Sequence, residues 1–323
     1  MFEGSTSINF SPDADIPALT GKVILVTGGS NGLGKESILQ LAKHEPTEIW
    51  MGALSIKFLL MDLGSPASIS EAANNFRKQL SRLDILMLNA GIMITPAGLT
   101  DDGYEIQFGT NYMGHALLTQ LLLPTLLNTA AWPNSDVCVV VLSSEAYNMA
   151  PDKGILWDIL RTEANDITTR ARYGQSKVAN ILYARELSKR YPQIKAVSVH
   201  PGLVKTNLGH ESASKSLLLR TAFTVARAVM GVDVATGVLN QLWAATGKGV
   251  KGGEYYEPVG VTGRGSKWTK DKERRISCGN GLRMRLTVIK PRTDTAPGGR
   301  RLTFQHKDIQ RGPAESAPEA ASA

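Results

Sequence analysis

The chain has 323 residues, of which 42% are hydrophobic and 20% are charged, and it carries a net charge of +7. This length and composition are those of a soluble globular protein with one large α/β domain and terminal segments, or with two small domains. Ten basic and four acidic side chains lie from Arg274 onward, so the excess positive charge belongs to the C-terminal tail. A strongly basic surface on the folded part is therefore excluded.

The termini and the cysteines indicate a cytoplasmic protein without a transmembrane segment. Residues 1–20 contain acidic side chains and no apolar core, so we expect no signal peptide there. The longest apolar run, Ala116–Leu127, contains polar residues and a proline and is too short to span a bilayer. Cys138 and Cys278 lie far apart, which fits a reducing compartment and excludes a disulfide framework.

Strand and helix patterns alternate from Lys22 to Tyr256. This alternation predicts a single Rossmann-type α/β domain with a doubly wound parallel sheet at 20–269, between an N-terminal extension (1–19) and a basic tail (270–323). All-apolar runs are typical of buried parallel strands. In chain order we expect a strand at 22–27, a helix at 32–44, strands at 48–51 and 56–61, a helix at 65–80, a strand at 84–88, a helix at 111–128, a strand at 137–142, a helix at 171–190, a strand at 195–199, helices at 214–230 and 233–245, and a strand at 253–256.

One connection breaks this alternation. Only four residues separate Met51 from Ile56, whereas neighbouring parallel strands need a crossover of roughly a dozen residues or more. We infer that the second crossover helix is missing, whether lost naturally, by alternative splicing or through a gene-model error. We then expect either the second or the third strand to be displaced, which would disturb the adenosine side of a nucleotide site.

The tail after Lys272 is rich in Arg, Gly, Pro, Ser and Ala and has no sustained periodicity. Such a composition predicts that residues 273–323 are mostly disordered. The alternative is a basic arm that binds nucleic acid, although we expect no nucleic-acid partner. Deleting residues 274–323 tests this alternative, because a basic arm would give a salt-sensitive interaction with DNA.

Two motifs carry the chemistry. Tyr173 and Lys177 lie four positions apart, so a helix places them on one face, about one turn apart. A lysine cation near a phenol lowers the tyrosine pKa and makes the tyrosine a proton donor and acceptor near neutral pH. This pair is common on helix surfaces and is informative only with a second motif. Glycines at 28, 32 and 34 follow the first strand, where backbone N–H groups at a helix start can bind a pyrophosphate, although a turn needed only for packing is the alternative.

Four short segments follow one another along the chain: Thr27-Gly28-x-x-x-Gly32-x-Gly34, Asn89-Ala90-Gly91, Tyr173-x-x-x-Lys177 and Pro201-Gly202. In their order and spacing they resemble the short-chain dehydrogenase/reductase family over residues 20–269. The long stretch between Ser144 and Tyr173, with Trp157-Asp158, is similar to the retinol-dehydrogenase-like branch, which includes many fungal oxidoreductases.

The resemblance implies four catalytic residues. Tyr173 would exchange the proton with the substrate oxygen, and Lys177 would hold the nicotinamide ribose and lower the tyrosine pKa. Ser144 would hydrogen-bond the substrate oxygen, a place for which Ser143 is less suited, and either serine could instead cap the strand end. Asn111 would support a water relay to the lysine, or would simply begin a helix.

The resemblance also implies a dinucleotide site. Asp62 and Leu63 match the pair that meets adenine, and Asn89, Ala90 and Gly91 match the wall on the adenosine side. The remaining cofactor-binding residues implied in this way are Thr27, Gly28, Ser30, Asn31, Gly32, Leu33, Gly34, Tyr173, Lys177, Pro201, Gly202 and Thr206.

The end of the second strand bears on the choice of cofactor. An acid there binds the ribose of NAD, and residues 50–54 contain none, so we expect NADP(H) more than NAD(H). The arginine expected in the resembling branch is absent as well, and Lys35 is a candidate for contacting a 2′-phosphate. His115, His200 and His210 have no spacing typical of a metal site, so we expect no metal.

These features predict an oxidoreductase that moves hydride between NADP(H) and a carbonyl or alcohol. The aliphatic segment 203–230 indicates an apolar substrate of small to medium size, bordered by Met149, Trp157 and helix 214–230. By analogy with fungal relatives, secondary-metabolite biosynthesis is a plausible setting. The alternative is a non-catalytic nucleotide-binding or sensor protein, or a defective isoform caused by the shortened 52–55 region. The resemblance also allows a homodimer through helices 111–128 and 171–190.

Overall fold

The computed structural model describes residues 7–50, 56–204 and 231–262. Within these residues the fold is a parallel seven-stranded sheet in the order β3-β2-β1-β4-β5-β6-β7. The order reverses between β1 and β4, so the predicted doubly wound sheet is confirmed. The strands are β1 (Val23–Val26), β2 (Glu48–Trp50), β3 (Ile56–Lys57), β4 (Ile85–Leu88), β5 (Cys138–Leu142), β6 (Lys195–Val199) and β7 (Tyr255–Tyr256).

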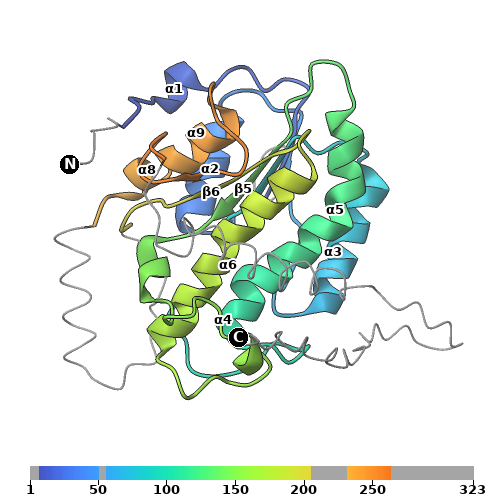
Figure 1. The fold of residues 1–323 in the computed structure, drawn as a ribbon. Helices are drawn as coiled ribbons and strands as arrows, with labels where there is room; N and C mark the ends of the chain where they lie inside the picture. The colour runs from blue at the N-terminus through green and yellow to red at the C-terminus, as the bar shows by residue number, and fades with distance from the viewer. Residues whose placement is uncertain (1–6, 51–55, 205–230, 263–323) are drawn as a thin grey trace, which may run out of the picture.

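Helices cover both faces of the sheet (Figure 1). One face packs against α3 (Pro66–Gln79), α5 (Gly114–Ala130) and α6 (Thr169–Arg190), and the other against α2 (Gly32–Ala42) and α9 (Leu239–Thr246). The short helices α1 (Pro12–Asp15) and α8 (Val234–Gly237) lie beside α9. Each face has its own apolar core, because β1, β4 and β5 are buried along their whole length. The remaining short elements are α4 (Ile106–Phe108), the π-helical turn η1 (Gly109–Met113), and the 3₁₀ turns η2 (Glu145–Met149) and η3 (Trp157–Ile159).

The predicted displacement of the second or third strand is wrong. β3 lies beside β2 in parallel, with Ile56 opposite Ile49 and Lys57 opposite Trp50. Because only two residues pair, the chain must travel just about 6 Å from the end of β2 to the start of β3. Five residues can span roughly 17 Å, so the connection is long enough without a crossover helix. The five residues themselves lie outside the described ranges.

The third strand is shorter than the sequence predicts. The expected strand at 56–61 pairs only over Ile56–Lys57, and beyond it the side chains of Phe58 and Leu60 are 65% and 81% exposed. β3 is an edge strand, so apolar residues beyond the paired segment have no second neighbour to bury them. The predicted helix at 214–230 and the tail lie outside the described residues.

Residues before β1 pack onto the domain. Phe10, Ile16 and Leu19 are buried in the core between the sheet and the helices α2 and α9. The backbone N–H of Ile8 donates to the carbonyl of Val259 at 3.0 Å. None of the described helices combines the length and the apolar character needed to cross a membrane.

Candidate active site

A cleft of about 680 Å³ opens at the carboxyl ends of the central strands. This is where open parallel α/β sheets bind their ligands. Predicted site residues that line it are Gly28, Asn31, Gly32, Leu33, Asn89, Ala90, Gly91, Ser144, Tyr173, Lys177, Pro201 and Gly202. Further lining residues, which the sequence analysis did not assign to the catalytic or cofactor sets, are Met93, Ile94, Leu142, Ser143, Glu145, Ala146, Met149, Arg170, His200, Leu203 and Val204.

Tyr173 and Lys177 lie one turn apart on α6, and both side chains reach this cleft. The ammonium nitrogen of Lys177 lies 5.3 Å from the centroid of the Tyr173 ring and donates to the carbonyl of Leu142 at 3.0 Å. Both residues are nearly buried, with 6% of Tyr173 and 5% of Lys177 exposed. The predicted pair of amine and phenol therefore shares one cavity.

Burial determines how these two groups ionise. It raises the pKa of Tyr173 above its ordinary value, and the hydrogen bond with Ser144 opposes this rise only in part. The pKa of Tyr173 is therefore shifted upward, and not downward as the sequence analysis expected, because loss of hydration disfavours the phenolate. Burial lowers the pKa of Lys177 to about 8. The phenol therefore holds its proton at neutral pH.

The two serines after β5 have different partners. The hydroxyl of Ser143 is buried and donates to the backbone carbonyl of Lys177 at 2.9 Å. Ser144 is hydrogen-bonded to Tyr173, and its hydroxyl accepts from the N–H of Ala146 at 3.2 Å, which caps η2. Of the two, Ser144 is the one whose hydroxyl contacts the tyrosine.

The glycine-rich turn packs closely against the end of β4. Gly28 has φ +65°, and a Cβ there would lie 2.8 Å from Cα of Ala90. The hydroxyl of Thr27 accepts the N–H groups of Asn89 and Ala90, both at 3.0 Å, so Thr27 anchors this contact without lining the cleft. Gly34 is buried behind the turn. Packing and nucleotide binding are thus compatible uses of the same glycines.

The turn and the start of α2 fit a bound dinucleotide. The first turn of α2 contains no acidic side chain, and Gly32 and Leu33 face the cleft. The positive end of the helix dipole at that point favours a phosphate. At Gly91 a Cβ would lie 3.1 Å from the Asn111 Oδ1 and 3.9 Å from the Lys177 Nζ, so glycine keeps this part of the cleft open.

Other predicted residues lie away from the cleft lining. Asp62 accepts the N–H of Gly64 at 2.8 Å, and Leu63 is buried in the core. Ser30 is exposed and lies outside the lining, and Thr206 is outside the described residues. Trp157, expected at the substrate pocket, instead packs edge-on against Phe108 with ring centroids 6.5 Å apart.

Asn111 sits in the π-helical turn η1 and is completely buried. Its amide binds both backbone groups of Ile92: Oδ1 accepts from the N–H at 2.8 Å, and Nδ2 donates to the carbonyl at 2.9 Å. Nδ2 also donates to the hydroxyl of Ser176 at 3.1 Å. Asn111 therefore connects the loop after β4 to α6, beside Lys177.

His115 is a positioning residue that the sequence analysis left without a role. Its Nδ1 lies 3.0 Å from the carbonyl of Asn111, and its Nε2 lies 2.8 Å from the hydroxyl of Thr27. Burial lowers its pKa to about 4, so the ring is neutral at neutral pH. A carbonyl only accepts, so the proton belongs on Nδ1, and Thr27 donates to Nε2.

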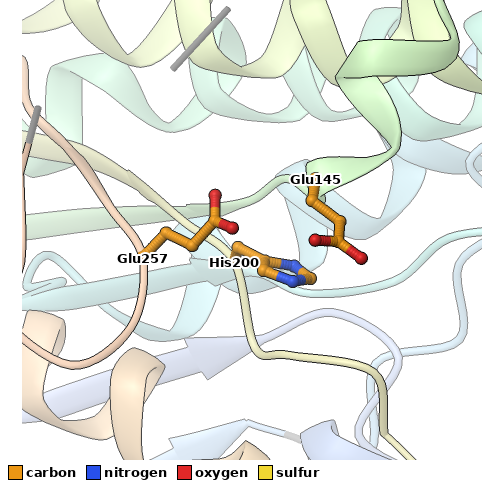
Figure 2. A group of neighbouring side chains, drawn as sticks. All are labelled: Glu145, His200 and Glu257. Carbon is orange, nitrogen blue, oxygen red and sulfur yellow. The ribbon is translucent and has the colours of Figure 1, made fainter. Parts of the chain in front are cut away.

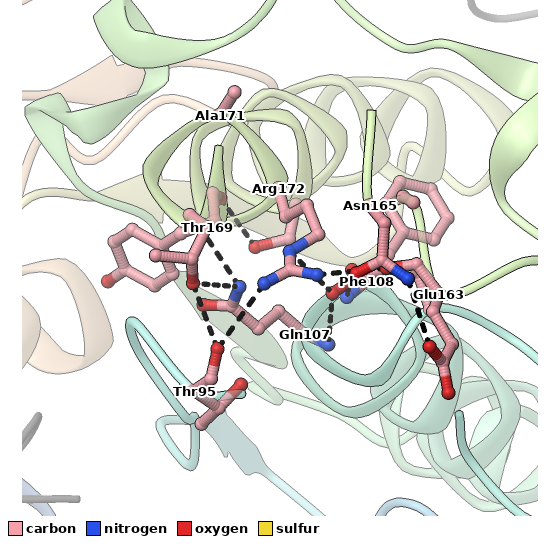
Figure 3. Close-up of polar contacts among 12 residues, drawn as sticks. Thr95, Gln107, Phe108, Glu163, Asn165, Thr169, Ala171 and Arg172 are labelled. Carbon is pink, nitrogen blue, oxygen red and sulfur yellow. Dashed lines mark hydrogen bonds and ion pairs between the residues drawn. The ribbon is translucent and has the colours of Figure 1, made fainter. Parts of the chain in front are cut away.

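A second network that sequence spacing did not reveal surrounds Arg172, the neighbour of Tyr173 (Figure 3). Its guanidinium pairs with buried Glu105 at 3.7 Å and donates to the carbonyls of Glu163 at 2.9 Å and Thr95 at 3.4 Å. Burial raises the pKa of Glu105.

The same network fixes the loop that lines the cleft. The side chain of Gln107 accepts the N–H of Ile94 at 2.8 Å. It also donates to the carbonyl of Thr169 at 3.1 Å (Figure 3). Ile94, which lines the cleft, is thereby held against the start of α6, one turn before Tyr173.

Residues 22–153 match the family model described as short chain dehydrogenase. An uncharacterized oxidoreductase of Schizosaccharomyces pombe is 40% identical over 72% of this chain and 74% of its own length. The chain belongs to the short-chain dehydrogenase/reductase family. Retinol dehydrogenase 13 of Mus musculus is 34% identical over 64% of this chain and 66% of its own, in line with the retinol-dehydrogenase-like branch.

A solved structure shares the fold. A protein of Mycobacterium paratuberculosis superimposes with a TM-score of 0.63 at 26% identity, covering 87% of this chain and 98% of its own. As a short-chain dehydrogenase/reductase, the protein is an oxidoreductase that acts between alcohol and carbonyl groups.

Proposed function

We propose that this short-chain dehydrogenase/reductase reduces a carbonyl group of a small-to-medium apolar substrate with NADPH, and catalyses the reverse oxidation with NADP⁺. The observation that carries this proposal is the meeting of Ser144, Tyr173 and Lys177 in one cleft, whose other end is the glycine-rich turn. A buried phenol that keeps its proton at neutral pH supports a role as proton donor, which suits reduction.

Each residue has a separate task in this proposal. The nicotinamide supplies the hydride when it is bound. Tyr173 gives its proton to the substrate oxygen, and Ser144 hydrogen-bonds the same oxygen and orients the carbonyl. Lys177 holds the nicotinamide ribose, and Asn111 supports a water relay to Lys177.

The cofactor would lie along the carboxyl ends of the strands. The start of α2 would bind the pyrophosphate, with Asn31, Gly32 and Leu33 at the contact, and the segment Asn89–Gly91 would line the adenosine side. NADP(H) is preferred in this proposal because no acid follows β2, and Lys35 is exposed on α2. The proposal includes contacts of Asp62 and Leu63 with the adenine, and of Ser30 and Thr206 with other parts of the cofactor.

The substrate end of the cleft supports an apolar ligand. Met93, Ile94, Met149 and Leu203 line it, and Met149 is 51% exposed, so its flexible side chain can adapt to a bound molecule. We also propose that the protein acts in secondary metabolism, is located in the cytoplasm and forms a homodimer through α5 and α6. The dimer is tested by light scattering on the purified chain.

Cofactor binding and turnover together test this function. The purified chain is titrated with NADPH while nicotinamide fluorescence is followed, and then assayed on a panel of apolar aldehydes and ketones. We expect saturable binding and turnover of at least one class. Binding without turnover would favour the sensor alternative, and no binding at high micromolar NADPH would favour a defective isoform.

A further inference from the structure

Three potential metal ligands meet at the edge of the cleft. Glu145, His200 and Glu257 each offer a ligand atom, and these atoms all lie within 4.8 Å of one another. Figure 2 shows the imidazole of His200 between the two carboxylates. The residues are far apart in sequence, so their spacing gave no sign of this cluster.

The topology of the sheet explains why they meet. β5, β6 and β7 are adjacent and parallel, and the three residues follow the carboxyl ends of these strands. His200 and Glu257 come directly after β6 and β7, and Glu145 comes three residues after β5. Parallel neighbours end at the same edge, so side chains placed there converge.

We propose that Glu145, His200 and Glu257 form a binding site for a divalent transition-metal cation, with Zn²⁺ as the best match. One imidazole and two carboxylates suit Zn²⁺ and Mn²⁺, whereas Mg²⁺ prefers oxygen ligands and retains its water. Nothing in the proposed redox function requires this ion.

The state of His200 is the independent observation that points to a ligand. The residue is 8% exposed, and its Nδ1 is buried without a hydrogen-bond partner among the described residues. A buried polar atom without a partner is costly, and a bound cation would remove this cost.

The surroundings fix two of the ligands in place. The backbone N–H of His200 donates to the carbonyl of Tyr256 at 3.0 Å, and its carbonyl accepts from the amide of Asn240 at 2.8 Å. The hydroxyl of Tyr255 donates to the Glu257 Oε2 at 2.6 Å, the kind of outer hydrogen bond that orients a ligating carboxylate.

The negative charge of the cluster and its access to solvent also suit a cation. In the part of the chain that the structure describes, neither Glu145 nor Glu257 forms an ion pair with a lysine or arginine, so their negative charge is uncompensated there. Glu145 is exposed and follows Ser144, which gives an ion a path from solvent. The ion would fasten the ends of β5, β6 and β7 at the substrate side of the cleft.

Zinc competition tests the site on the full chain. The protein is treated with EDTA, and Zn²⁺ binding is measured against a chromophoric chelator for the wild type, Glu257→Gln and Glu145→Gln. Glu254→Gln is the matched control, because Glu254 flanks the other end of β7 and its replacement removes the same charge without removing a ligand. Zn²⁺ should also raise the melting temperature of the wild type by roughly 5 °C or more at saturation.

Both ligand variants should weaken the Zn²⁺ affinity at least about tenfold, while the control stays within about twofold. Glu145 is exposed, so Glu145→Gln keeps the test valid should Glu257→Gln fail to fold. Unchanged affinity in the two ligand variants, equal losses in Glu254→Gln, or no Zn²⁺ binding by the wild type would overturn the proposal. Mg²⁺ binding as tight as that of Zn²⁺ would overturn the assigned class of ion.

Discussion

The ammonium of Lys177 donates to the main-chain carbonyl of Leu142, the last residue of β5, at 3.0 Å. The amide of Asn180, one turn along α6, donates to the same carbonyl at 2.9 Å. These two bonds fix the register between α6 and β5. Because Ser143 and Ser144 follow Leu142 directly, that register also sets where Tyr173 meets Ser144.

The buried amine predicts how the rate depends on pH. Burial lowers the pKa of Lys177 from 10.5 to about 8, so the ammonium is present below pH 8 and is lost above it. If the charge holds the cofactor, kcat/KM for reduction should fall as pH rises through about 8. The measurement is a pH profile with saturating carbonyl substrate and limiting NADPH. A profile that is level well beyond pH 9 would show that this charge is not needed.

The two serines provide a matched pair of variants. Ser144→Ala should lower kcat by about 10²-fold or more, because it removes a hydrogen bond to the reacting oxygen. Ser143→Ala should leave kcat near that of the wild type and cost about 1 kcal/mol of stability, because its hydroxyl bonds only the backbone of Lys177. Steady-state kinetics and urea unfolding separate the two effects. Equal losses of kcat in both variants would refute the assignment of Ser144.

The buried ring of His115 predicts that the folded protein loses stability at low pH. Its pKa is about 4 in the folded protein, below the ordinary 6.5, so the unfolded chain binds the proton more readily. The neutral ring therefore contributes to the free energy of unfolding above pH 6.5. This contribution is lost as the pH falls toward 4, by about 3 kcal/mol in total. His115→Gln keeps a neutral polar side chain and should remove that part of the pH dependence. Urea unfolding across this range measures it, and an unchanged slope would contradict the account.

The buried pair of Arg172 and Glu105 predicts non-additive effects on stability. Arg172→Met leaves the carboxylate of Glu105 buried without its partner and should cost about 3–5 kcal/mol. The double variant with Glu105→Gln should recover part of this loss, because the uncompensated charge is gone. Denaturant unfolding of the two single variants and the double variant forms the cycle. Additive losses would indicate that the two side chains do not interact.

Much of the architecture could be predicted because its signals are local. The strand β5 is a run of buried apolar residues, and the four-residue spacing of Tyr173 and Lys177 defines one helix face whatever surrounds it. The short edge strand β3 was overestimated because the exposure of Phe58 and Leu60 depends on what lies beside them. Local pattern carries no such information.

The supporting contacts could not be predicted because they join distant segments. Arg172 contacts Glu105 and Thr95, and His115 contacts Thr27, with no periodicity relating the partners. The same limit explains the missed cluster at the ends of β5, β6 and β7. The direction of the Tyr173 pKa shift also could not be predicted from the sequence, since it depends on how deeply the phenol is buried.

Replacement of Tyr173 by phenylalanine tests the central claim most directly. Phenylalanine keeps the ring beside Lys177 and removes only the hydroxyl that exchanges the proton. We predict that kcat for carbonyl reduction falls by about 10²- to 10⁴-fold, while the dissociation constant for NADPH changes less than about threefold. Retention of most of the rate by Tyr173→Phe, with NADPH binding intact, would contradict the account.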